Sequence, residues 1–113
     1  MPDHGSEQRR FPRIPAERAL LVKKVGDDDS EALAKTRSVG GGGCMFVHHE
    51  PLGVGARVEL LISLAGRVIK VEGCVAWEVV KAPGDVEVGV EFLSISPKDK
   101  RALDEILVDS APA

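Results

Sequence analysis

Residues 58–79 read VELLISLAGRVIKVEGCVAWEV, and this stretch decides the fold. In its first half apolar residues occupy every second position: Val58, Leu60, Ile62 and Leu64. Successive side chains of a strand point to opposite faces, so this period of two predicts a strand with one buried and one wet face. The dipeptide 65–66 (Ala-Gly) that follows is short enough for a tight hairpin connection.

The same pattern continues on both sides of this hairpin. Downstream, the predicted inward residues of the next strand are Ile69, Val71, Val75, Trp77 and Val79. Residues 82–85 (APGD) predict a turn, and residues 86–92 (VEVGVEF) alternate again. Upstream, the apolar runs 19–25 and 44–47 predict shorter strands, and residues 26–30 (GDDDS) predict a solvated hairpin tip. Regular alternation indicates an antiparallel sheet, and short strands with tight turns favour closure into a small barrel without exposed edges.

The period changes at Ser96, where a helix is predicted to begin. Serine is a preferred N-cap, proline is favoured at the first helical position, and Asp99 stands three residues after the cap. Apolar residues then recur at helical spacing, as a stripe for packing on the barrel: Ala102, Leu103, Ile106 and Leu107. With 113 residues the chain fits one all-β domain, divided into a flexible arm (1–13), a barrel with its terminal helix (14–108) and a short tail (109–113).

Composition narrows the classes of function. The net charge is −3, which disfavours binding to a nucleic-acid polymer. Residues 1–8 are polar and lack the apolar segment of a signal peptide, and no apolar run is long enough to insert in a membrane, so a cytoplasmic protein is expected. Cys44 and Cys74 lie in apolar runs and are expected as buried thiols, and no metal site or cofactor is predicted.

Positive charge is concentrated near the start of the chain. Arg9, Arg10 and Arg13 offer forked donors suited to phosphate oxygens and to the O6/N7 edge of guanine. About 25 residues later the chain reads TRSVGGGG (36–43), where glycine backbone can approach a ligand closely and present N–H groups to anionic oxygens. Together the two segments predict a site for an anionic, guanine-bearing ligand. Ser38 lacks the surroundings of a nucleophile, so an enzyme is not predicted.

The order of these segments resembles the PilZ domain family. The segments are residues 9–15 (RRFPRIP), 38–41 (SVGG), 45–47 (MFV), 73–77 (GCVAW), 89–92 (GVEF) and 93–94 (LS), followed by the terminal helix. The resemblance covers the chain from Arg9 to about Leu107. It implies a six-stranded barrel with a C-terminal helix and, in many members, binding of the bacterial messenger cyclic di-GMP.

The family's two binding motifs are matched unequally. Its Arg-x-x-x-Arg arm is matched by Arg9 and Arg13, with Arg10 between them. Its second motif, Asp/Asn-x-Ser-x-x-Gly, is matched only in part, because Thr36 replaces the carboxylate or amide while Ser38 and Gly41 agree. A shifted register makes Gly43 the motif glycine, Ser38 the Asp/Asn position and Gly40 the serine position, and both registers remain open.

Two functions follow from the resemblance. The first is a cyclic di-GMP receptor in bacterial signalling, of the kind that regulates motility or biofilm formation. Its arm closes over the nucleotide, and its output goes to a protein partner not identified by the sequence. The alternative is a degenerate PilZ domain that acts as a protein–protein adaptor without nucleotide. The sequence leaves both a monomer and a homodimer open.

Overall fold

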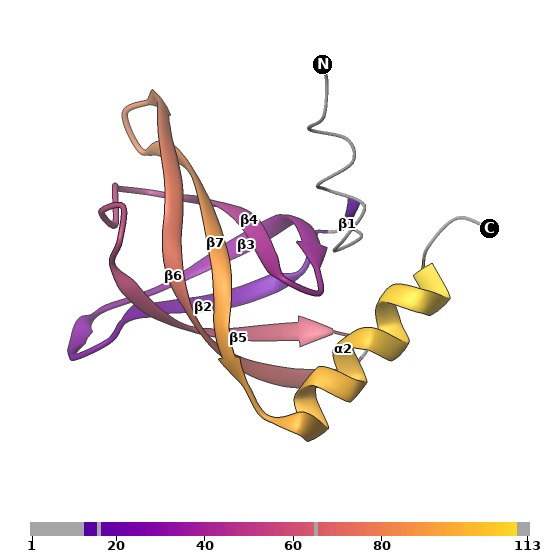
Figure 1. Ribbon diagram of the computed structural model, residues 1–113. Helices are drawn as coiled ribbons and strands as arrows, with labels where there is room; N and C mark the ends of the chain where they lie inside the picture. Colours follow the sequence, from indigo (N-terminus) through magenta and orange to yellow (C-terminus); the bar gives the residue numbers. More distant parts are fainter. Residues whose placement is uncertain (1–12, 16, 65, 111–113) are drawn as a thin grey trace, which may run out of the picture.

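The computed structural model describes residues 13–15, 17–64 and 66–110 and consists mostly of strands (Figure 1). The elements in chain order are β1 (Arg13–Pro15), β2 (Ala19–Lys24), β3 (Asp27–Gly40), β4 (Gly43–His48), β5 (Arg57–Leu64), β6 (Arg67–Ala82), β7 (Asp85–Ile95) and α2 (Pro97–Ser110).

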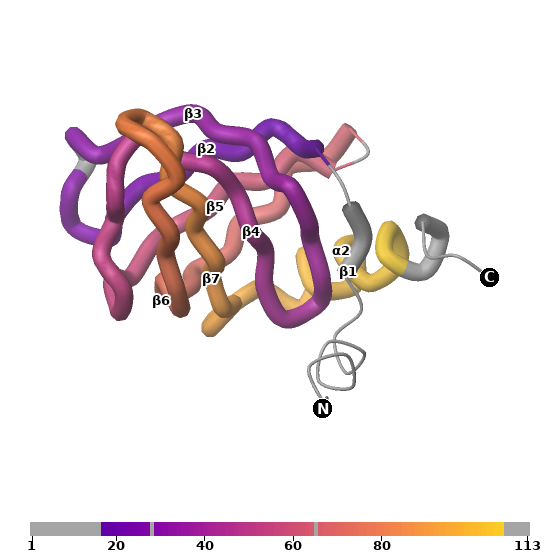
Figure 2. Tube along the Cα trace, turned by 90° about the horizontal axis from the view of Figure 1, so that it is seen from above, coloured from indigo at the N-terminus to yellow at the C-terminus, as the bar shows by residue number. Residues whose placement is uncertain are grey.

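Six antiparallel strands close into a barrel, which confirms the predicted fold class. The strands follow the order β3-β2-β5-β6-β7-β4, and the pairing of β3 with β4 closes the ring. The short β1 adds to β3 beside β2. Seen from above, the barrel lies to one side of α2 (Figure 2). Closure satisfies the backbone hydrogen bonds that an open sheet would leave at its edges.

The alternating residues of β5 form the core as predicted. Val58, Leu60, Ile62 and Leu64 are each at most 2% exposed, and they pack with buried residues of all the other barrel strands. Cys44 is also buried, whereas Cys74 is only half-buried.

The prediction that Trp77 and Val79 point inward is wrong. Their exposed fractions are 37% and 43%. Beyond Cys74, β6 no longer pairs with β5, so this end of the strand is paired on one side only, with β7. A bulge between Val75 and Trp77 shifts the register of β6 with β7, so Val75 points into the core and Trp77 to the outer face. The Glu78 carboxylate holds this part of β6 to the β4–β5 loop by accepting the N–H groups of Leu52 and Gly53 at 2.6 and 3.0 Å.

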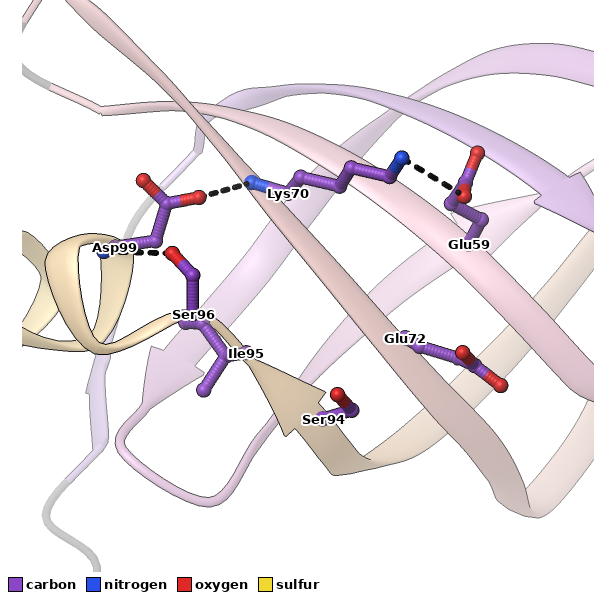
Figure 3. A pocket seen from close by; sticks show the side chains of 7 residues that line it. All are labelled: Glu59, Lys70, Glu72, Ser94, Ile95, Ser96 and Asp99. Atoms are coloured by element: carbon purple, nitrogen blue, oxygen red, sulfur yellow. Dashed lines mark hydrogen bonds and ion pairs between the residues drawn. The ribbon is translucent and has the colours of Figure 1, made fainter.

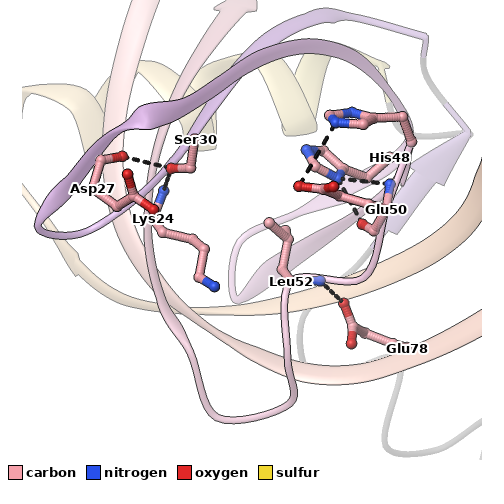
Figure 4. Close-up of polar contacts among 8 residues, drawn as sticks. Lys24, Asp27, Ser30, His48, Glu50, Leu52 and Glu78 are labelled. Atoms are coloured by element: carbon pink, nitrogen blue, oxygen red, sulfur yellow. Dashed lines mark hydrogen bonds and ion pairs between the residues drawn. The ribbon is translucent and has the colours of Figure 1, made fainter.

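The predicted hairpin tip at 26–30 is also displaced. The turn consists of Val25 and Gly26, and β3 already begins at Asp27. Gly26 has φ of +86°, a conformation that favours glycine. The Ser30 hydroxyl fixes the start of β3, since it donates to the Asp27 carbonyl at 2.6 Å and accepts the Lys24 N–H at 2.8 Å (Figure 4). The acidic run therefore starts a long strand that carries the predicted site residues at its other end.

The terminal helix begins as predicted. The Ser96 hydroxyl accepts the Asp99 N–H at 3.1 Å, and the Asp99 carboxylate accepts the Lys70 N–H at 3.2 Å, which ties the helix start to β6. The apolar stripe packs on the core, with Ala102, Leu103 and Leu107 buried and Ile106 half-buried. The helix thus covers one end of the barrel.

Candidate functional site

The end of the predicted arm lies against the glycine segment. Arg13 begins β1 and pairs with Gly40 of β3, and Pro15 pairs with Ser38. Arg9 and Arg10 lie outside the described residues. The backbone register therefore brings the last arginine of the first motif beside the second motif, although the two are more than 20 residues apart in sequence.

Thr36 lies inside the protein. It is 0% exposed, and its hydroxyl accepts the Arg18 N–H at 2.9 Å, while its own N–H donates to the Arg18 carbonyl at 2.9 Å. These bonds fix the segment that joins β1 to β2. The Arg18 Nε is buried and has no hydrogen-bond partner among the described residues, so Thr36 adjoins an arginine with a donor that the described residues leave unpaired.

A bulge separates Thr36 from Ser38. The register of β3 with β4 shifts between these two residues, which makes Arg37 the extra residue of the bulge and leaves it exposed. Bulges redirect side chains. Ser38 is half-buried, and its neighbour Val39 belongs to the core. Alternation then places Ser38 on the outer face of the barrel.

Ser38 starts a row of residues that crosses four strands. It pairs with Met45 of β4, Met45 pairs with Gly89 of β7, and Gly89 pairs with Trp77 of β6. Directly paired residues share a face, so the row lies on the outer wall and spans about 14 Å at the usual strand spacing. A Cβ on Gly89 would overlap the Trp77 indole. The glycine therefore lets the indole lie flat on the barrel, partly exposed, in line with Ser38.

Sequence reasoning missed Trp77 as a surface residue. The signal that pointed to it is the pair formed by Trp77 and Gly89, since a glycine within an alternating strand marks close approach of another group.

The glycines at 40–43 have different structural roles. Gly41 and Gly42 form the turn between β3 and β4. The Gly42 carbonyl accepts the Phe92 N–H at 2.9 Å, and a Cβ on Gly43 would collide with the Val90 carbonyl oxygen. A Cβ on Gly41 would only reach ordinary contact distance, 3.8 Å from the nearest atom. The fold therefore requires glycine at 43, whereas space alone does not require it at 41.

A hollow on the described part of the protein lies elsewhere and is acidic. It has a volume of about 280 Å³ and is lined by Glu59, Lys70, Glu72, Ser94, Ile95, Ser96 and Asp99 (Figure 3). None of the predicted site residues lines it. Its carboxylates are paired, Glu59 with Lys23 and Lys70, and Glu72 with Arg57 at 2.6 Å. Carboxylates repel an anionic ligand, so this hollow does not extend the candidate site.

The two histidines differ in burial although their ring centroids lie only 4.4 Å apart. His48 is 3% exposed and its Nδ1 lies 2.7 Å from the Glu50 carbonyl oxygen, whereas His49 is exposed (Figure 4). Within the described residues no group of His, Cys, Asp and Glu has the arrangement of a metal site. Over the same residues no helix has the length and apolarity that crossing a bilayer requires.

The structure defines the chain as a small closed β-barrel domain covered by one helix. It belongs to the PilZ family, because the PilZ domain profile matches residues 7–109. A comparison with curated proteins finds no match.

Solved structures of PilZ proteins share the fold. The Bacillus subtilis inhibitor of motility (MotI/DgrA) has 18% identity and a TM-score of 0.73, over 96% of this chain and 56% of that one. The PilZ domain of YcgR from Escherichia coli with c-di-GMP has 19% identity and a TM-score of 0.68, over 90% of each chain. The K. pneumonia MrkH–c-di-GMP complex has 18% identity and a TM-score of 0.69, over 89% of this chain and 51% of that one. The chain thus spans about half the length of MotI and MrkH.

Proposed function

We propose that this protein is a receptor for cyclic di-GMP. The observation that carries the proposal is the pairing of Arg13 with Gly40, which joins the arginine motif to the glycine motif at one end of the outer wall. Membership of a family with cyclic di-GMP receptors supports it, as do the YcgR and MrkH structures that contain this nucleotide.

Each part of the site has a role that its chemistry suits. Arg9, Arg10 and Arg13 bind the phosphates and the guanine edges through forked, charge-assisted hydrogen bonds. The Ser38 hydroxyl and the backbone of the glycine turn supply further polar contacts. The exposed indole of Trp77, which shares the outer face with Ser38, offers a surface on which a guanine stacks.

The receptor works by changing a surface rather than by catalysis. An arm that closes over a bound nucleotide creates a new face, and a cytoplasmic protein partner reads that face. Control of motility or biofilm formation is the signalling context that this function fits.

A second candidate is an adaptor that binds a protein partner without nucleotide. Its support is Thr36, which stands at the position of the family's carboxylate or amide in the first of the two motif registers. Thr36 is buried, and its hydroxyl accepts the Arg18 N–H. Loss of the carboxylate or amide costs about 1–3 kcal/mol, which is roughly ten- to a hundredfold in affinity. Such a loss weakens a receptor without removing its arginine contacts, so we favour the receptor.

Trp77 provides the test of the site. It is the single tryptophan of the chain, so its fluorescence reports on this part of the wall alone. We expect cyclic di-GMP to change the Trp77 emission saturably, and Trp77→Ala to weaken binding by about 1–3 kcal/mol, the usual contribution of base stacking. Trp77→Phe retains an aromatic face and is expected to stay within a few fold of the wild type.

Val80→Ala is the matched control, because Val80 is exposed on the same strand but is outside the row that begins at Ser38. If calorimetry detects saturable binding while the Trp77 emission stays constant, or if Trp77→Ala binds as well as Val80→Ala, the outer wall is not the binding surface.

A further inference from the structure

The helix α2 borders both halves of the candidate site. It contacts β1, where the arm joins the barrel, and it lies against the turn between β3 and β4 (Figure 2). A Cβ on Gly41 would lie 3.8 Å from the Lys100 Nζ, 3.9 Å from an Asp104 carboxylate oxygen and 3.9 Å from a Leu107 methyl carbon. These three residues are spaced four and three apart, so they form one stripe along the helix that faces the glycine turn.

The charged members of this stripe form an ion pair. The Lys100 Nζ lies 2.7 Å from an Asp104 carboxylate oxygen, and the side chains are 43% and 51% exposed. An ammonium group has three donors, so Lys100 retains donors beyond the one that Asp104 accepts. Pairs this exposed contribute little to stability. Lys100 can therefore exchange Asp104 for another anion without a large loss.

We propose that Lys100 is a phosphate-binding residue of the nucleotide site and that Asp104 competes with the phosphate for it. The inference rests on the proposed function, and it adds a lysine from the opposite end of the chain to the nucleotide site. A phosphate at the glycine turn attracts Lys100 and repels Asp104, so occupancy of the site breaks their ion pair. Arrival of the nucleotide is thereby linked to the surface of α2.

The experiment is a calorimetric titration of the full chain with cyclic di-GMP at fixed salt. Lys100→Ala is expected to weaken binding about five- to tenfold, through loss of a charge-assisted hydrogen bond in a partly exposed position. Asp104→Asn keeps the size of the side chain but removes the competing charge, and it is expected to tighten binding about two- to fivefold.

Lys98→Ala is the matched control. Lys98 is an exposed lysine of the same helix, and its position two residues before Lys100 places it on the other side. It is expected to bind as the wild type does. Melting temperatures of all variants are recorded, since a change confined to the binding constant separates a ligand contact from a structural role.

The outcomes separate this inference from the function on which it rests. If Arg13→Ala weakens binding but Lys100→Ala equals Lys98→Ala, the receptor stands and Lys100 is not part of its site. Weaker binding by Asp104→Asn likewise overturns the competition between Asp104 and the phosphate. If the wild-type chain binds no nucleotide, both the function and the inference fail.

Discussion

Arg13→Ala is expected to lower the affinity for cyclic di-GMP at least tenfold, with little change in the melting temperature. The guanidinium makes charge-assisted, two-pronged contacts with phosphate or guanine, and each such hydrogen bond contributes about 1.5–3 kcal/mol. Arginine is almost never fully buried and adds little to stability as a surface charge. Arg9→Ala is expected to behave in the same way. Calorimetric titration measures the affinity, and thermal denaturation measures the stability.

Arg67→Ala is a suitable control for these variants. Arg67 is exposed at the start of β6, next to the turn between β5 and β6, and this turn contributes none of the candidate site residues. The Arg67→Ala substitution removes the same positive charge from the chain and leaves the arm unchanged. If Arg9→Ala and Arg13→Ala both bind as tightly as Arg67→Ala, the arm is not the binding element and the receptor proposal fails.

Gly43→Ala is expected to lower the free energy of unfolding by about 2–3 kcal/mol, because a Cβ there collides with the Val90 carbonyl oxygen and backbone must move. For a domain of this size the melting temperature should fall by on the order of 10 °C. Gly41→Ala is the matched control, since its nearest neighbour would stay 3.8 Å away and its φ is not among the positive values. Thermal denaturation of the two variants measures the difference.

The same two variants also help to decide whether Gly41 or Gly43 is the glycine of the second binding motif. If Gly43→Ala destabilises and Gly41→Ala does not, the glycine at 43 is explained by barrel closure alone. The glycine at 41 is then explained by its surroundings near the ligand. Equal stability of the two variants would show that the close approach of β4 to β7 is not a constraint on this position.

The barrel could be predicted from β5 and α2 because the spacing of their apolar residues matches the positions that are buried. Apolar residues occupy every second position from Val58 to Leu64, with Leu61 the one apolar residue between them, and Ser96 and Asp99 form the cap that their spacing predicts. The strand β3 was missed because most of its first half is polar and exposed. Its position is determined by pairing with β2 rather than by an apolar face of its own.

The site was predictable in its residue types but not in its arrangement. The arginine and glycine motifs are local in sequence, so they could be found there. Trp77 was placed in the core because the bulge after Val75 is not visible in an alternating sequence. Lys100 could not be found at all, because its position beside Gly41 depends on how α2 packs on the barrel.

The most direct test of the receptor proposal is a calorimetric titration of the wild-type chain with cyclic di-GMP, with GMP as the control ligand. The proposal predicts saturable binding with a dissociation constant on the order of micromolar, about −8 kcal/mol, and no comparable binding of GMP. A folded protein that takes up no cyclic di-GMP at ligand concentrations of about 1 mM would contradict the proposal and leave the adaptor as the function of this PilZ domain.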